Sequence, residues 1–543
     1  MSLRAIVAFA LLGVMGFCVP VAAAGHAALP APNSFAADGP YPMSHHNPAQ
    51  TDVTIVDGPT RGKNLDRADA QFVPVVWCSA PIVKKVGEHT TVIAGTPHGA
   101  AKINATGESL ELVSFMPYPG LETEHTDVTS EDLSWFVDKI DEKRRNKQDL
   151  RLLLYSAYMM FDLEMNWSNG GSGAYGVIDR DGYYYTFFDR TRLLKAFDGN
   201  DIGAPLEPVR DVKITDGLPE DVAEGITRIL GISMTYDGHI VVAATGALFV
   251  LDRDLNRKDY LLFPGEHVEN SVAVDEKSIY VVTSKNMRRV VWTGEKLSMD
   301  DEEGAWVSLY DVMPEGEAID LGAASHGSGT TPTLMGFGDD EDKLVLISDG
   351  NPNGAQLVAF WREEIPADFE QKPGTRSRRI ADQIPIPAAT TTVEASPAAY
   401  GTGVVLLNST YPESAPFPLN IVGNAFLAGT TRKAPLGAQK FEWDADENRF
   451  KATWFLPEID NTDWVPPTVS PHNGLAYVAT KVDGTYEYRA IDWETGAEVA
   501  RWSFPDDSVL WNNWGGITTL LEDGDLLLGG FFGVKRYDIG HLR

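Results

Sequence analysis

The stretch "GISMTYDGHIVVAATGALFVLDRD", residues 231–254, predicts the fold of this chain. Two runs rich in Val, Ile and aromatic residues, which favour strands, are separated by Asp237-Gly238. Asp-Gly supplies the positive φ angles that a tight hairpin turn needs. The stretch therefore indicates antiparallel strands joined by short turns.

The same plan recurs along the chain. A strand-like run, a polar or Gly turn and a second run follow one another in residues 79–107, 175–189, 270–292, 331–350, 396–410, 467–496 and 516–538. With the opening stretch this makes about eight units, spaced irregularly at roughly 40 to 60 residues, and such repetition is typical of propellers. We expect an all-β fold, a single β-propeller of seven or eight blades, with eight favoured. The alternative is a set of several unrelated β domains.

One segment breaks the repeat. Residues 129–165 place Leu133, Phe136, Val137 and Ile140 on one face of a helix. We expect a helical insertion here, between the first two blades. The predicted organisation is then a signal peptide (1–24), an N-terminal extension with the strand that enters the fold (25–72), and the propeller domain (73–543).

The first 24 residues resemble an export signal in composition. Arg4 precedes an apolar stretch that ends in Ala22-Ala23-Ala24, which fits the small-residue rule for signal peptidase. A retained membrane anchor or a lipoprotein are the alternatives, although Phe17 stands before Cys18 where a lipoprotein needs a small residue. No later stretch approaches the roughly 20 apolar residues of a spanning helix. We expect cleavage near Ala24, no membrane span in the mature chain, and a periplasmic or secreted protein.

The composition is strongly acidic. The chain has 45 Lys and Arg against 77 Asp and Glu, a formal net charge of -32. Such a surface repels nucleic acid and anionic membranes, so we expect neither as a partner. Cys78 is the only cysteine after cleavage of the signal, which excludes an intramolecular disulfide.

Two stretches resemble quinoprotein-like propellers with PQQ-type repeats. "YPMSHHNPAQTD" (41–52) is similar to the segment that precedes their first blade, and "YRAIDWETGAEVARWSF" (488–504) is similar to their repeat. The resemblance implies an eight-bladed propeller in which the Asp, Thr and Trp of the repeat are structural. The adjacent cysteine pair of one PQQ dehydrogenase class is absent, so PQQ is not expected. No Cys-x-x-Cys-His motif occurs either, so haem is not expected.

A further stretch, "ENSVAVDEKSIYVVTS" (269–284), resembles the SMP-30, gluconolactonase and strictosidine-synthase-like propellers. In those proteins the Asn that opens this inner strand binds a central Ca²⁺, and Asn270 is the matching position. The resemblance implies a metal-assisted hydrolase or lactonase.

Propeller sites form at one mouth of the channel, so polar residues at the starts of inner strands are candidates. Asn270, Glu394 and Asn513 come from three blades and offer oxygen ligands that suit Ca²⁺. A histidine at the rim would act as base, with His326 first and His46 second. Each residue also has a plain structural interpretation, since Asn and Glu often cap turns. In 41–52, adjacent side chains on an extended strand point to opposite faces, so His45 and His46 are not expected to bind one ion together. We interpret this stretch mainly as an entry strand that helps close the ring, with one His at the mouth of the channel.

Three functions stay open. The first is an exported propeller enzyme, a Ca²⁺-assisted hydrolase or lactonase, or a related isomerase, acting on a small organic substrate. The second is a non-catalytic propeller scaffold that binds envelope proteins or a ligand. The third is a PQQ-type oxidoreductase, which would show a flat Trp floor and basic residues for the carboxylates of the cofactor.

Overall fold

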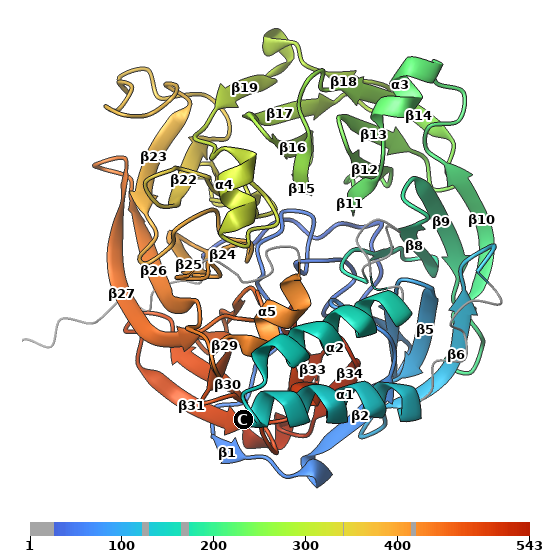
Figure 1. Ribbon diagram of the computed structural model, residues 1–543. Coiled ribbons are helices and arrows are strands. Elements are labelled where there is room, and N and C mark those ends of the chain that lie inside the picture. The colour runs from blue at the N-terminus through green and yellow to red at the C-terminus, as the bar shows by residue number, and fades with distance from the viewer. Residues whose placement is uncertain (1–26, 122–129, 164, 166–172, 340, 414–419) are drawn as a thin grey trace, which may run out of the picture.

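The computed structural model describes residues 27–543 except 122–129, 164, 166–172, 340 and 414–419, and the predicted signal peptide therefore lies outside the described residues. Eight antiparallel sheets surround a common axis as the blades of a β-propeller (Figure 1). The fold and the favoured count of eight blades are confirmed. None of the helices that the structure describes is long and apolar enough to cross a membrane.

The first four blades follow one another in sequence. From the innermost strand outward they are β3 (Ile82–Val86), β4 (His89–Gly95), β5 (Gly99–Asn104) and β6 (Glu111–Pro117); β7 (Val177–Ile178), β8 (Tyr183–Phe188), β9 (Arg192–Phe197) and β10 (Glu207–Lys213); β11 (Ile229–Met234), β12 (Ile240–Ala244), β13 (Ala247–Leu251) and β14 (Arg257–Leu262); and β15 (Val268–Val274), β16 (Ser278–Thr283) and β17 (Asn286–Trp292), with β18 (Leu297–Ser298) and β19 (Trp306–Leu309) both paired to β17.

The last four blades continue the ring. They are β20 (Thr333–Met335), β21 (Leu344–Ser348), β22 (Gln356–Trp361) and β23 (Ile380–Pro385); β24 (Ala398–Tyr400), β25 (Gly403–Leu407), β26 (Leu436–Asp444) and β27 (Arg449–Asp460); β28 (Thr468–Ser470), β29 (Leu475–Val482), β30 (Thr485–Asp492) and β31 (Glu498–Ser503), with β1 (Lys63–Asn64) parallel to β31; and β32 (Thr519–Leu520), β33 (Leu526–Leu528), β34 (Gly533–Tyr537) and β2 (Ala70–Pro74).

The stretch that predicted the fold forms most of the third blade. Its turns place Gly238 and Gly246 at φ angles of 85° and 71°, a region that favours glycine. Strands β12 and β13 are buried along their whole length, because neighbouring blades cover both faces of the sheet. This burial explains why these strands are continuous apolar runs rather than alternating patterns.

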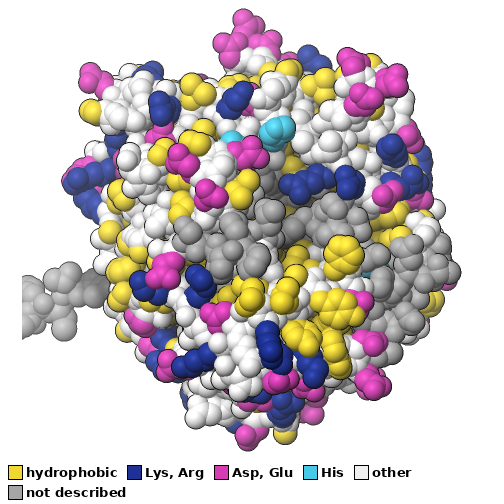
Figure 2. Space-filling model, viewed as in Figure 1, with side chains coloured by type: hydrophobic (Ala, Val, Ile, Leu, Met, Phe, Trp, Pro, Cys, Tyr) yellow, Lys and Arg dark blue, Asp and Glu magenta, His cyan; other side chains and the backbone are white. Residues whose placement is uncertain are grey.

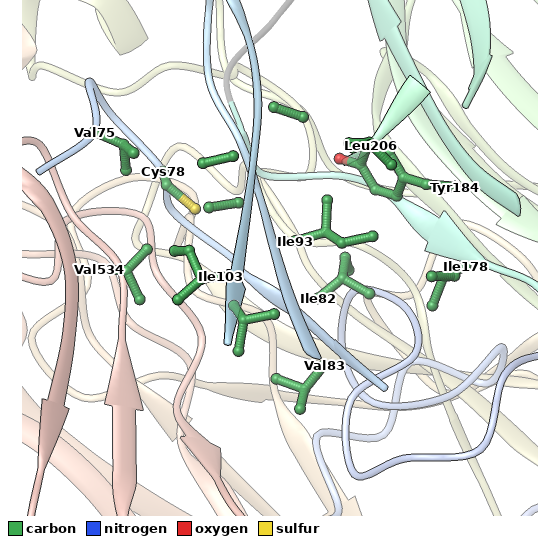
Figure 3. Packing of buried hydrophobic residues seen from close by; sticks show 14 of the residues in the cluster. Val75, Cys78, Ile82, Val83, Ile93, Ile103, Ile178, Tyr184, Leu206 and Val534 are labelled. Atoms are coloured by element: carbon green, nitrogen blue, oxygen red, sulfur yellow. The ribbon is translucent and has the colours of Figure 1, made fainter. Parts of the chain in front are cut away.

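The ring is closed by the N-terminal strand β2. It pairs antiparallel with β34 and forms the outer strand of the eighth blade. Apolar side chains of blades eight, one and two then pack into one cluster, in which Val534, Ile82 and Tyr184 come from the three blades in turn (Figure 3). Cys78 is buried in this cluster as a free thiol.

Residues 41–52 do not form the strand that closes the ring, contrary to the interpretation from sequence. They run through the middle of the ring, where Figure 1 shows the blue N-terminal segment. We call residues 41–54 the plug. Backbone N–H groups on the inner strands of six blades donate hydrogen bonds to its carbonyl oxygens. The donor and acceptor pairs are Val83 and Tyr41, Ile178 and Pro42, Val274 and Pro48, Leu334 and Ala49, Ala399 and Thr51, and Val469 and Asp52. The plug thus satisfies inner-edge N–H groups that would otherwise be unpaired.

The helical insertion is confirmed between blades one and two, as two helices, α1 (Ser130–Arg145) and α2 (Asp149–Asp162). The chain reverses between them at Lys147, whose φ is 52°. Leu133, Phe136 and Ile140 are buried against α2 and α5 (Ile421–Leu427), as the helical pattern predicted. The other short helices are α3 (Glu220–Gly225) and α4 (Glu315–Asp320).

Candidate active site

A cavity of about 450 Å³ opens at the mouth of the channel where the inner strands begin. Helices α4 and α5, on the near face in Figure 1, contribute Ile319 and Ile421 to its wall. Every blade adds lining residues at or just before its innermost strand, which in blade order include Ser79, Tyr175, Arg228, Asn270, Gly329, Ser396, Pro466 and Ile517. This volume suits a small organic ligand.

The floor of the cavity carries a histidine held by a buried aspartate. His45 Nδ1 lies 2.7 Å from Asp52 Oδ2, and His45 lines the cavity. The backbone N–H of His45 donates to Tyr41 Oη at 3.0 Å. The carboxylate orients the imidazole, which is the arrangement that positions a general base in many enzymes.

The plug achieves this arrangement through unusual backbone angles. His45, His46, Gln50 and Asp52 have φ angles of 58°, 71°, 59° and 53°. Non-glycine residues adopt this region at a cost of about 1 kcal/mol or more each, and the ring of inner strands holds them there. Such strain concentrates at functional sites.

The first carboxyl of the cavity is Glu269, which lies in β15 and is 7% exposed. Burial raises the pKa of Glu269 to about 7, although His326 and the backbone N–H groups of Gly327 and His326 oppose the shift. Oε1 of Glu269 lies 3.6 Å from Nε2 of His326. Near neutral pH this carboxyl is therefore available to accept or to donate a proton.

The second carboxyl is Glu394, which precedes β24. Its Oε1 accepts hydrogen bonds from the backbone N–H groups of Ala324 (2.9 Å) and Ser325 (3.1 Å). Burial raises the pKa of Glu394 to about 7, and the negative charge of Glu269 adds to this shift. The two carboxyls therefore interact, and their protons leave in steps that belong to the pair.

Asn270 lines the same cavity, but its side chain is fully engaged with the protein. Oδ1 accepts hydrogen bonds from Tyr175 Oη (2.5 Å), the backbone N–H of Ser271 (2.8 Å) and Thr331 Oγ1 (3.2 Å). Nδ2 donates to the carbonyl of Gly329 at 2.6 Å. Burial raises the pKa of Tyr175 to about 12, so it stays a hydrogen-bond donor at neutral pH.

The structure brings some of the predicted residues together and separates others. Asn270 and Glu394 share the cavity, whereas the Asn513 side chain lines a separate small cavity with Asp460, Asp463 and Lys481. In the described part of the chain, no group of three or more His, Cys, Asp or Glu side chains is arranged to hold a metal ion. The three predicted ligands do not fit one Ca²⁺. Asn513 lies outside this cavity, and the side-chain oxygen of Asn270 already accepts three hydrogen bonds. Of the three, only Glu394 keeps an oxygen in this cavity without a hydrogen-bond partner among the described residues.

The two predicted bases also differ in their placement. His326 stands beside Glu269 and donates from Nδ1 to the carbonyl of Met313 at 3.0 Å. His46 is 6% exposed beneath the cavity floor, and neither of its ring nitrogens has a hydrogen-bond partner among the described residues. Burial lowers the pKa of His46. His45, its neighbour, is the histidine that reaches the cavity.

Aromatic side chains form the wall at blades seven and eight. Trp464 and Trp514 both line the cavity, with ring centroids 5.4 Å apart and an angle of 40° between the rings. Arg228 is the only Lys or Arg among the described lining residues. A quinone cofactor with several carboxylates would need more cationic partners, so this lining offers it little.

The fold and this cavity define an eight-bladed β-propeller with a cavity at the channel mouth. No family model matches the sequence. Over 390 residues, 68% of this chain and 70% of the relative, the sequence is 31% identical to an uncharacterized protein of Archaeoglobus fulgidus. The chain belongs to the same family as that protein.

The chain is also similar to solved structures that include a dehydrogenase, a putative lactonase and a propeller domain. A europium-containing methanol dehydrogenase is 12% identical, with a TM-score of 0.49 over 91% of this chain and 90% of that one. A putative 6-phosphogluconolactonase from Bacteroides fragilis is 11% identical, with a TM-score of 0.38 over 77% and 98%. The Cps50 (Swd1) propeller domain of Myceliophteria thermophila is 10% identical, with a TM-score of 0.35 over 66% and 94%. These likenesses concern the fold alone.

Proposed function

We propose that this protein is an enzyme that uses general acid–base catalysis on a small organic substrate in the channel-mouth cavity. A hydrolase or lactonase, or a related isomerase, is the reaction class that these groups suit. The observation that carries the proposal is the pair Glu269 and Glu394, two carboxyls in one cavity whose pKa values are each raised to about 7. Catalytic acids and bases work best with a pKa near the operating pH.

The pair supplies both partners of a proton transfer. Around neutral pH it holds about one proton, because ionisation of one carboxyl disfavours ionisation of the other. In hydrolysis, the ionised carboxyl takes a proton from the attacking water, and the protonated one gives a proton to the leaving oxygen. In isomerisation the same two groups remove and return a proton.

His45 provides a third proton-transfer group on the floor. Asp52 fixes the ring through Nδ1, and His45 lines the cavity. The other ring nitrogen, Nε2, has no hydrogen-bond partner among the residues that the structure describes. This ring therefore either assists the carboxyls or binds a polar group of the substrate. Asp52 acts only through His45 and is a positioning residue.

Calcium stays a proposal. Glu394 and Glu269 are the carboxylates that would hold an ion in this cavity, with backbone carbonyl oxygens completing the shell. A bound ion would polarise a carbonyl oxygen of the substrate. Elemental mass spectrometry of the purified protein, with thermal melting before and after addition of a chelator, tests this. About one Ca²⁺ per chain, with a lower melting temperature after chelation, would support a bound ion. No Ca²⁺ and an unchanged melting temperature would support proton transfer without an ion.

Export is also proposed, because residues 1–24 have the composition of a signal peptide. Intact-mass measurement of protein recovered from the periplasm or medium of an expressing cell tests it. Cleavage near Ala24 is expected, and an uncleaved chain retained in the cytoplasm would contradict it.

The experiment that tests the catalytic proposal is a screen of lactones and esters with the parent and three variants. E269Q and E394Q each remove one ionisable group while keeping the shape of the side chain. E295Q changes an exposed glutamate in a turn on the outer part of the fourth blade and serves as the control. We expect E269Q and E394Q to lose about 100-fold or more in kcat, and E295Q to match the parent. Turnover that survives in both cavity variants would overturn the proposal.

A further inference from the structure

Two arginines stand together near the mouth of the channel, one of them in the lining of the cavity. Arg228 precedes β11 and lines the cavity, and Arg190 lies in the turn between β8 and β9 of the adjacent blade. The backbone N–H of Ile229 donates to the carbonyl of Arg190 at 2.6 Å, which places the two residues side by side. Both are solvent accessible. Dark-blue Lys and Arg side chains lie beside the centre of this face in Figure 2.

Neither guanidinium has an ion-pair partner in the part of the chain that the structure describes. Among the described residues, no carboxylate oxygen lies within 4.0 Å of Arg190 or of Arg228. Partial burial lowers the pKa of Arg228, and the charge of Arg190 lowers it further, while Glu269 opposes both effects. Two like charges are thus held side by side with no carboxylate of the described residues in contact with either, which costs free energy unless an anion joins them.

Other cations of the same two blades are paired with carboxylates. The neighbouring arginines show it: Arg192 binds Asp211, and Arg253 binds both Asp179 and Asp181. An acidic surface also repels anions in general, so a local pair of unneutralised arginines marks the place where an anion is favoured.

The opposite wall of the cavity is apolar. Arg228 belongs to the third blade, and Trp464 precedes the first strand of the seventh, which faces it across a ring of eight. Trp464 is joined there by Trp514, Ile421, Pro466 and Ile517. A ligand that spans the cavity therefore meets cations at one end and apolar and aromatic side chains at the other.

We propose that the cavity binds an amphipathic organic anion, with its carboxylate or phosphate head on Arg190 and Arg228 and its apolar body against Trp464 and Trp514. Guanidinium groups bind both heads through paired hydrogen bonds. As the substrate class, this rests on the proposed function; as a binding preference, it stands by itself. The head would then lie beside Glu269 and within the same cavity as Glu394.

The test uses four probes with one apolar body: 4-phenylbutyrate, 4-phenylbutyl phosphate, 4-phenylbutanol and 4-phenylbutylamine. Binding is measured by calorimetry and by quenching of tryptophan fluorescence, since Trp464 and Trp514 line the cavity. We expect at least one anion to bind about ten-fold or more tightly than the alcohol, and the amine to bind most weakly. The tighter of the two anions identifies the head group.

Variants separate the two ends of the cavity. R190Q/R228Q should reduce the affinity for the anion to about that of the alcohol and leave the alcohol unchanged, and W464L should weaken all probes alike. R210Q, on the outer strand β10 of the second blade, is the matched control and should change nothing. Equal binding of amine and anion, an anion affinity unaffected in R190Q/R228Q, or no binding of any probe at millimolar concentration would overturn the inference.

The outcome is distinguishable from that of the catalytic test. Anion binding that depends on the arginines, without any turnover that depends on Glu269 and Glu394, would reject only the proposed catalysis. Turnover of neutral or cationic substrates with no preference for anions would reject only this inference.

Discussion

At the scale of single residues, Glu269 and Glu394 owe their chemistry to a cavity that withholds water from a negative charge. The protein keeps each carboxyl partly hydrogen-bonded, through backbone N–H groups, yet burial dominates both pKa values. When a carboxyl with a raised pKa ionises, the free energy of unfolding falls. This loss of stability can be measured without a substrate.

The substitution E394Q should make the protein more stable at high pH. The pKa of Glu394 is raised from its usual 4.5 to about 7, so the folded state binds more protons than the unfolded state between these values. Stability from this group is then complete below about pH 4.5 and is lost as pH rises through about 7. Because Glu394 is not fully buried, we expect E394Q to exceed the parent by about 1 to 2 kcal/mol in unfolding free energy at pH 8 and by little at pH 5.

Denaturant unfolding at both pH values measures this difference. E295Q, in an exposed turn, should follow the parent at both. An E394Q protein less stable than the parent at pH 8, or equally stable at both pH values, would show that the carboxyl ionises normally.

The placement of the site residues was partly predictable. Asn270 and Glu394 were expected at one mouth because both stand at starts of inner strands, and they share the cavity there. His46 was the second candidate for the base, but His45 is the histidine that lines the cavity. Both residues have left-handed backbone angles, so the alternation of an extended strand does not apply to them. Arg228 lacks any local motif, since its role depends on a neighbour, Arg190, in another blade.

At the scale of elements, the loop between β19 and β20 depends on its glycines. A Cβ on Gly329 would meet Glu394 Oε2 and the carbonyl of Val393, each at 2.7 Å, closer than side chains pack. The loop can therefore approach the second carboxyl only because position 329 has no side chain.

We expect G329A to destabilise the protein by about 1 to 3 kcal/mol and to move Glu394. The matched control is G316A, in α4, where a Cβ would meet nothing within 4 Å; it should be neutral or stabilising by up to about 1 kcal/mol. Thermal melting of the two variants compares them. Equal effects would mean that the close approach at Gly329 does not exist in solution.

The helix α2 shows a second contrast, between its two faces. Leu152 is fully buried, whereas Phe161 is 89% exposed. Leu150, Leu154 and Tyr158 are exposed as well. L152A should cost about 2 to 5 kcal/mol through the cavity that it leaves, and F161A should change stability by about 0.5 kcal/mol or less. Denaturant unfolding checks both, and a large loss in F161A would contradict the position of this helix.

Sequence pattern located these helices and the strands for plain reasons. The apolar residues of α1 recur with a helical period, and the strand pairs flank Gly turns, so both signals are local. The break between α1 and α2 was missed because Lys147 takes the left-handed turn that glycine would have marked. The plug was taken for a strand because its backbone bonds go to six different blades, which no local pattern encodes.

At the scale of the whole molecule, the N-terminal region performs two tasks. β2 closes the ring from outside, and the plug fills the channel and carries His45 and Asp52 to the cavity floor. The ring and the site therefore share one segment, so that loss of the plug should affect both.

A chain that begins at residue 57 retains β2 but lacks the plug. We expect it to lose several kcal/mol of stability, because backbone groups on the inner strands lose their partners. A chain that begins at residue 27 should melt like the intact mature protein, and differential scanning calorimetry compares the two. Equal melting temperatures would contradict a structural role for the plug.

The measurement that tests the central claim most directly is the titration of the glutamate side chains by difference infrared spectroscopy, on protein labelled with ¹³C at the glutamate carboxyls. Comparison of the parent with E269Q and E394Q isolates each signal. We expect two carboxyls that titrate around pH 7. One of them should be missing in each variant, and the remaining one should shift toward lower pH because its partner's charge is lost. Two signals that titrate near the ordinary glutamate pKa of about 4.3 would contradict a proton-transfer site in this cavity.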